Sequence, residues 1–255
     1  MNPLRFFVYT GVFTLSCLLT STGCATTATD SSGGRVKSYA VQDPIEGFNQ
    51  RSFKVSEFSD QKILRPVARG YRAVVPQPIR TGVSNFFSNL RGIDSALNGF
   101  LQGKPRRGFT DVYRVLVNST LGLGGLFDPA TRAGIEFQDE DFGQTLAVWG
   151  YTESAYVYLP VVGPSTVRDL PNLFFRFLWP NVALGDSYNL GLTSLDVVAA
   201  REQALVLTDA LDATALSPYV FTREAYYQRR RFQIFDGAPP QVDKFDEFDD
   251  LDDEG

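Results

Sequence analysis

The acidic residues of 136–141 are the first candidates for chemistry, because carboxylates that lie close together can bind a metal ion or share a proton. The run contains Glu136, Asp139, Glu140 and Asp141. No histidine stands anywhere in the chain to join them, and histidine is the commonest protein ligand of metals. We therefore predict a solvated acidic loop here and no metal site.

The absence of histidine also argues against catalysis in general. Histidine is the usual general base and the middle member of a hydrolase triad. No recognisable arrangement of a nucleophile takes its place in the sequence. We predict that the protein is not an enzyme, requires no cofactor and has no nucleic-acid partner.

A second candidate is the glycine-rich run 121–127, which contains Gly122, Gly124, Gly125 and Phe127. It is not a phosphate-binding loop, because no Lys followed by Ser or Thr completes that motif. Glycine loses more conformational freedom on folding than any other residue. A glycine-rich run therefore indicates that the backbone needs a positive φ, a close approach or movement there. Two interpretations stay open: a tight turn between helices, and a mobile segment at the lip of a channel.

Cys24 is the side chain whose chemistry is clearest. Residues 6–20 form an uncharged and mostly apolar run, and Ser21, Thr22 and Gly23 lead into the cysteine. This pattern predicts a secretory signal that is cleaved between Gly23 and Cys24. It resembles the bacterial lipobox, with Ser21 in place of the usual Leu, so we expect the Cys24 thiol to carry lipid. An ordinary signal that leaves Cys24 as a free thiol is the alternative.

The composition divides the chain into four parts. We predict a lipoprotein signal peptide over 1–23 and a lipid-anchored flexible tether over 24–42, which is rich in Thr, Ser and Gly. A folded domain over 43–237 follows, and then an acidic disordered tail over 238–255. A short partner-docking helix is the alternative for the tail.

Hydrophobic periodicity predicts a mainly α fold. Apolar residues recur at spacings of three and four over 79–101 and again over 109–117, and further helices are expected over 194–211 and 218–235. The best strand pattern is 155–162, which Pro160 weakens. Beyond residue 20, no uncharged apolar run is long enough to span a bilayer.

Two further segments carry candidate contact residues. Phe174, Phe175, Phe177 and Trp179 crowd a segment that is apolar almost all round, which favours the membrane interface over an ordinary protein core. The run 229–231 consists of Arg229, Arg230 and Arg231 at the expected end of a helix. These cations favour a helix C-terminus in any case, and contact with lipid head groups or an acidic partner is the functional alternative.

Several short motifs, in a fixed order across about 43–237, together resemble the MlaA/VacJ family of outer-membrane lipoproteins. They are DPIEGFN at 43–49, RPVA at 65–68, VPQP at 75–78, VSNF at 83–86, FLQG at 100–103, NSTLGLGG at 118–125, FGQTL at 142–146, YLP at 158–160, SPY at 217–219 and REAYYQR at 223–229. Each motif alone is a weak signal, whereas the ordered set covers essentially the whole folded body.

The resemblance implies a ring-like bundle of amphipathic helices embedded in the inner leaflet of the outer membrane, with a central amphipathic channel. It implies a lipid-anchored protein on the periplasmic side that removes mislocalised phospholipid from the outer leaflet. The lipid would pass to a soluble periplasmic phospholipid carrier (MlaC-like) for return to the inner membrane, which maintains lipid asymmetry. A trimeric porin is the implied partner. A structural, porin-associated adaptor without a lipid path is the alternative function.

Overall fold

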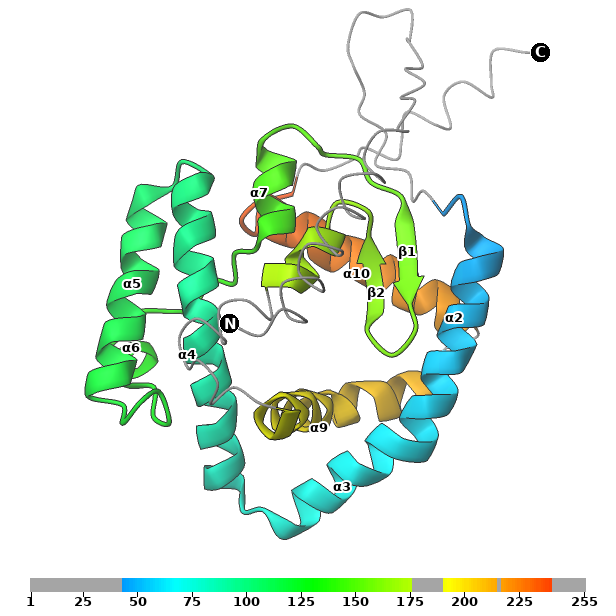
Figure 1. Ribbon diagram of the computed structural model, residues 1–255, viewed down its shortest axis with the longest axis horizontal. Helices are drawn as coiled ribbons and strands as arrows, with labels where there is room; N and C mark the ends of the chain where they lie inside the picture. The colour runs from blue at the N-terminus through cyan, green and yellow to red at the C-terminus, as the bar shows by residue number, and fades with distance from the viewer. Residues whose placement is uncertain (1–42, 176–189, 215–216, 240–255) are drawn as a thin grey trace, which may run out of the picture.

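The computed structural model describes residues 43–175, 190–214 and 217–239, and this part of the chain is mainly α-helical (Figure 1). Its helices are α2 (Glu46–Ser59), the π-helical segment η2 (Asp60–Leu64), α3 (Arg65–Val74), α4 (Gln77–Leu101), α5 (Pro105–Thr120), α6 (Pro129–Arg132), α7 (Phe142–Val148), α9 (Leu190–Thr214) and α10 (Pro218–Ile234). The predicted mainly α fold is therefore confirmed, and each helix expected from periodicity is present.

The described β-structure is one antiparallel hairpin of β1 (Tyr156–Leu159) and β2 (Gly163–Thr166), in which Tyr156 pairs with Thr166. The strand expected over 155–162 is shorter than predicted. β1 ends directly before Pro160, which lacks the N–H that a strand ladder needs. Val161 then turns the chain with φ of 68°.

The elements form a ring-like frame (Figure 1). Helices α2, α3 and α4 follow one another around the right, lower and left sides, and α5 lies on the outside of α4. Contacts of α4 with α7, of α7 with α10, of α10 with β2 and of α2 with β1 complete the circuit. Helix α9 lies within this frame and contacts both α3 and α4.

Local sequence explains where the helices begin. Proline stands at the first or second position of α3, α4, α5, α6 and α10, where its missing N–H costs nothing and its fixed φ suits a helix. Asp128 and Asp141 cap α6 and α7, because their carboxylates accept from the backbone N–H of Thr131 and Gln144.

Ion pairs join α9 to the frame, in addition to apolar contacts such as those of Leu192 and Leu195 with the cluster around Phe87 and Leu90. Arg201 of α9 donates two hydrogen bonds to Asp60, at 2.5 and 2.8 Å. Glu202 of α9 accepts from Arg72 at 2.7 Å and also from Arg80. The clusters of buried apolar residues are small by comparison, one around Phe87 and Leu90 and one around Tyr156, Tyr158 and Tyr219.

Candidate functional site

Helix α5 has its amphipathic pattern reversed relative to a helix of a water-soluble protein. Its apolar side chains face outward, with Phe109 67% and Leu116 58% exposed, while Asp111 and Arg114 are buried against the rest of the structure. A soluble monomer rarely leaves a continuous apolar face open to water. We call Phe109, Val112, Tyr113 and Leu116 the α5 face.

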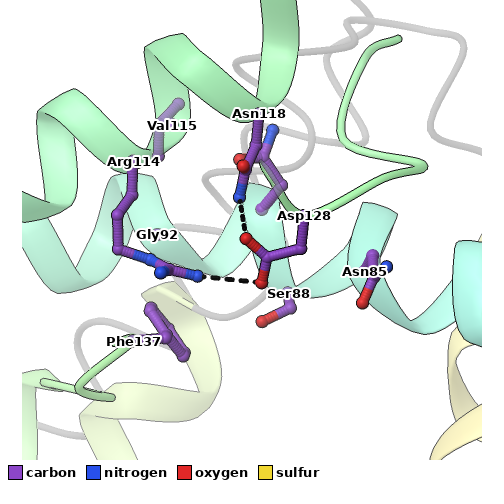
Figure 2. Close-up of a pocket in the computed structure, with 9 residues that line it drawn as sticks. Asn85, Ser88, Gly92, Arg114, Val115, Asn118, Asp128 and Phe137 are labelled. Carbon is purple, nitrogen blue, oxygen red and sulfur yellow. Dashed lines mark hydrogen bonds and ion pairs between the residues drawn. The ribbon is translucent and has the colours of Figure 1, made fainter. Parts of the chain in front are cut away.

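The buried side of α5 is polar, and its side chains form hydrogen bonds and an ion pair with neighbouring residues (Figure 2). Arg114 pairs with Asp128 at 3.1 Å, as Figure 2 shows. It also donates to the hydroxyl of Thr131 and the carbonyl of Ile135. Asn118 donates to the other oxygen of Asp128 at 3.0 Å. Because these polar groups satisfy one another, they can be buried between helices without the large cost of an unpaired polar group.

Small residues allow α4 and α5 to pack very closely. A Cβ added to Gly99 would lie 3.0 Å from the backbone nitrogen of Gly108, and one added to Gly92 would lie 2.7 Å from a methyl group of Val115. Close approach through small residues, with polar side chains between the helices and apolar side chains outside, is the packing mode of helices in membranes. The α4–α5 pair therefore has the side-chain distribution expected of a lipid-facing hairpin.

The glycine-rich run 121–127 is a turn between α5 and α6 that packs on α4. Gly124 and Gly125 have φ of 72° and 91°, and Leu123 also lies in the left-handed region. A Cβ on Gly122 would clash with two backbone carbonyl oxygens, those of Asn118 and Phe127. Backbone geometry and close packing therefore explain why glycine stands at these positions. Their role at a lipid path stays a prediction.

We predict that Gly124→Ala lowers stability by about 1–2 kcal/mol, because an L-residue with positive φ is strained even where the space is open. Gly70→Ala in α3 is the matched control, since that glycine has no neighbouring atom within 4 Å and no positive φ. The control should be neutral or stabilising by up to about 1 kcal/mol. Melting temperatures of the two variants would test this. Equal melting temperatures would show that the turn relaxes freely.

Further apolar side chains are exposed around the frame. On α2, η2 and α3 they are Val55, Phe58, Ile63, Val67 and Val74, and on the turn after α5 they are Leu121, Leu123, Leu126 and Phe127. Buried polar residues occur throughout the interior, including Asn49, Asn98, Gln144 and Arg168. The reversal seen in α5 therefore extends to other elements.

The three consecutive arginines of α10 have different environments. Arg230 is only 7% exposed, and its guanidinium pairs with Asp141 and Asp169, both at 2.6 Å. Burial alone lowers the pKa of Arg230, but the two carboxylates raise it well above its ordinary value. Arg230 therefore directs its guanidinium into the protein, onto Asp141 and Asp169, and its contact with head groups or a partner stays a prediction. Arg229 is exposed and remains a candidate, and Arg231 is half-buried.

The predicted solvated acidic loop is wrong in its central residue. Glu140 is 3% exposed, accepts from Gln102 at 2.9 Å and pairs with Arg107. Asp141 caps α7 and pairs with Arg230. These acids can be buried because arginines from distant elements pair with them. The loop sequence alone does not reveal such partners. No acidic group of metal-binding form occurs among the described residues.

Comparison with known proteins identifies the family. The profile described as MlaA lipoprotein matches residues 41–233. The chain belongs to the MlaA lipoprotein family. The intermembrane phospholipid transport system lipoprotein MlaA of Shigella flexneri is 37% identical over 82% of this chain and 82% of its own length. The MlaA lipoprotein of Haemophilus influenzae is 31% identical over 76% of this chain and 80% of its own length.

A solved chain supports the same conclusion for the MlaA fold. It comes from work described as "Structural basis for maintenance of bacterial outer membrane lipid asymmetry", is 38% identical and superposes with a TM-score of 0.67. The match covers 76% of this chain and 99% of that chain. The predicted family resemblance is confirmed, and the names of the MlaA relatives describe phospholipid transport.

The remaining predicted sites of the chain lie partly outside the described residues. Phe174 and Phe175 are half-buried, and the ring of Phe175 lies 4.8 Å from that of Phe142 on α7. Phe177, Trp179, Gly23 and Cys24 lie outside the described residues, as does the tail beyond residue 239. Among the helices that are described, none combines the length and the hydropathy needed to cross a membrane.

Sequence reasoning did not single out the buried polar face of α5. Asp111, Arg114 and Asn118 recur at spacings of three and four, opposite the apolar stripe that was recognised. This polar stripe on the same helix was the sequence feature from which a buried polar face could have been predicted. The Arg230 cluster had no such signal, because its members are up to 89 residues apart.

Proposed function

We propose that this protein lies in the inner leaflet of the outer membrane, anchored by lipid on Cys24, and removes misplaced phospholipid from the outer leaflet. The lipid passes along a path inside the helical frame to a soluble periplasmic carrier. The frame associates with a trimeric porin. No covalent bond of the phospholipid is made or broken.

The observation that carries this proposal is the outward α5 face combined with the buried polar face behind it. A phospholipid that crosses a bilayer must take its charged head group through hydrocarbon, where unpaired polar groups are very costly. A protein that is apolar outside and polar inside lowers this cost. The names of the relatives, which describe intermembrane phospholipid transport, support the same direction.

Several predicted sites find their place in this proposal. The turn containing Gly122, Gly124, Gly125 and Phe127 would form an apolar lip of the lipid path. Phe174, Phe175, Phe177 and Trp179 would lie at the membrane interface, where aromatic side chains are favoured. Arg229 and Arg231, near the end of α10, would meet phosphate head groups or an acidic partner.

The anchor and the transport role can be tested together in cells. Cys24→Ala should abolish labelling of the protein by a fatty-acid probe. Outer-leaflet phospholipid should rise in cells without the protein and return to normal with the unaltered chain. With Cys24→Ala it should stay high, because stable anchoring in the outer membrane needs the acyl chains in addition to the apolar face of the frame.

Two results would contradict these assignments. Label that persists on the Cys24→Ala protein would exclude lipidation at that residue. Normal asymmetry in cells without the protein, together with altered porin abundance, would favour the adaptor function instead.

A further inference from the structure

Ser95 of α4 makes three polar contacts that one hydroxyl cannot satisfy in the usual way. Its Oγ lies 2.7 Å from Oδ2 of Asp111 and 2.6 Å from the backbone oxygen of Gln138. The backbone N–H of Glu140 donates to the same Oγ at 3.1 Å. A serine hydroxyl has one hydrogen and two acceptor positions. It can therefore donate to Asp111 or to Gln138, but not to both.

All three contacts of Ser95 can be hydrogen bonds at the same time only when the Asp111 carboxyl carries a proton. The Asp111 carboxyl then donates to the Ser95 Oγ, the Glu140 N–H donates to the same oxygen, and the Ser95 hydroxyl donates to the Gln138 carbonyl. If Asp111 were ionised, two oxygens without a shared hydrogen would face each other at hydrogen-bond distance. Ser95 is fully buried and Asp111 is 2% exposed, so water cannot relieve that repulsion.

The charged groups around Asp111 do not supply the missing hydrogen. From α5 itself, Arg107 is bonded to Glu140 and Asp236, and Arg114 is bonded to Asp128 and Ile135. Among the described residues neither guanidinium donates to Asp111, and Glu140 in the loop adds a negative charge nearby. Burial, the largest influence, raises the pKa of Asp111 to about 6, although a hydrogen bond that Ser95 could donate to the ionised carboxylate and the charge of Arg114 both oppose this rise.

The contact joins three separate pieces of the fold beside an open groove. Ser95 belongs to α4, Asp111 belongs to α5, and Gln138 and Glu140 belong to the loop before α7. The groove has a volume of about 760 Å³. Phe109 and Tyr113 of α5 form one wall, and Ile135 and Gln138 of the loop form the other. Ser95 therefore fastens the loop wall to the helical hairpin.

We propose that Asp111 is a proton-operated latch: its protonated carboxyl helps to fasten the loop 134–140 to the α4–α5 hairpin, and ionisation weakens this attachment while the bonds of Arg114 to Ile135 and of Arg107 to Glu140 remain. The folded state favours the protonated form. Its stabilisation is therefore complete below the ordinary pKa of an aspartate, near 4, and is lost as the pH rises toward about 6. Mild acid closes the groove wall and neutral pH loosens it.

Asp111→Asn provides the test, because an amide N–H₂ donates to the Ser95 Oγ at every pH. The full-length acylated protein in detergent would be compared with this variant by hydrogen exchange of the peptide that contains Glu140. Relative to the variant, the unaltered protein should open about 100-fold more readily at pH 7 than at pH 4, since a shift of about two pH units corresponds to two factors of ten. Comparison at equal pH removes the effect of intrinsic exchange rates.

A second readout does not depend on the variant folding. Infrared spectra of the unaltered protein should contain a buried carboxylic-acid band that titrates near pH 6. The band should be missing from Asp111→Asn. Exchange that changes in parallel in both proteins from pH 4 to pH 7, or the absence of any carboxyl band above pH 5, would overturn the latch.

Discussion

Replacing Arg230 by Met should destabilise the folded protein by about 3–5 kcal/mol, which would make it the largest single-residue effect in α10. The substitution roughly keeps the volume of the side chain but removes the guanidinium that pairs with both Asp141 and Asp169. It leaves two carboxylates in a buried cluster without their shared partner. The loss measures this uncompensated burial rather than the strength of one ion pair.

The loss of stability in the same variant should depend on pH through the Asp169 carboxyl. Burial raises the pKa of Asp169, but Arg230 and Arg168 lower it below its ordinary value. Stability from Asp169 is therefore present above pH 4 and is lost as the pH falls further. Without Arg230, the burial of Asp169 is still opposed by Arg168 and by the hydrogen bonds of Tyr226 and Thr166, but its pKa rises. The deficit of Arg230→Met relative to the unaltered protein should therefore shrink as the pH falls from 7 toward 4.

Arg229→Met is the matched control for Arg230→Met, because the neighbouring side chain is exposed and its loss should change stability by no more than about 0.5 kcal/mol. Arg230→Lys keeps the charge but loses the planar fork, so an intermediate loss is expected. Urea unfolding of the full-length chain in detergent at pH 4 and pH 7 would measure all three variants. Equal stabilities of Arg229→Met and Arg230→Met would contradict the assigned role.

Gly143 shows how tightly this cluster is built. A Cβ at this position would collide with Oδ1 of Asp169 and lie 2.7 Å from a guanidinium nitrogen of Arg230. Only glycine therefore allows α7 to approach the ion pairs. The motif FGQTL was recognised in the sequence as a family feature, and its glycine has this physical reason.

Periodicity predicted the helices well but did not predict which side of each helix is buried. The apolar stripes over 79–101 and 109–117 both fall in helices, yet the second stripe faces outward. An amphipathic pattern shows that a helix has one apolar and one polar face. It does not show whether the apolar face contacts protein or lipid. That choice depends on the environment, which the predicted lipid anchor at Cys24 indicated only indirectly.

The ion-pair clusters could not be predicted from sequence because their partners are far apart along the chain. Glu202 lies 122 and 130 residues from its two arginine partners, and Asp43 lies 180 residues from Arg223. Local windows see these residues as ordinary surface charges. Their burial follows from ring closure, which brings the start of the described chain onto α10.

The α5 face provides the sharpest test of membrane embedding. In water, replacing exposed apolar side chains with lysine changes stability by about 0.5 kcal/mol or less. In the hydrocarbon region each lysine costs about 2.5–3.5 kcal/mol at the centre of a bilayer, and the apolar burial of the original side chain is lost as well. The double variant Phe109→Lys with Leu116→Lys should therefore lose most of its binding to phospholipid vesicles when its acyl chains are absent.

The matched control exchanges the two apolar residues, as Phe109→Leu with Leu116→Phe, and keeps the α5 face apolar without adding charge. It should bind vesicles like the unaltered protein in a flotation assay, while the double lysine variant should remain with the aqueous fractions. Urea unfolding without vesicles should give similar stabilities for both, since these side chains are exposed. Flotation of the double lysine variant at the level of the control would mean that the α5 face does not enter lipid. A protein partner would then be the expected cover for the outward apolar stripe, because soluble monomers rarely leave such a face open to water.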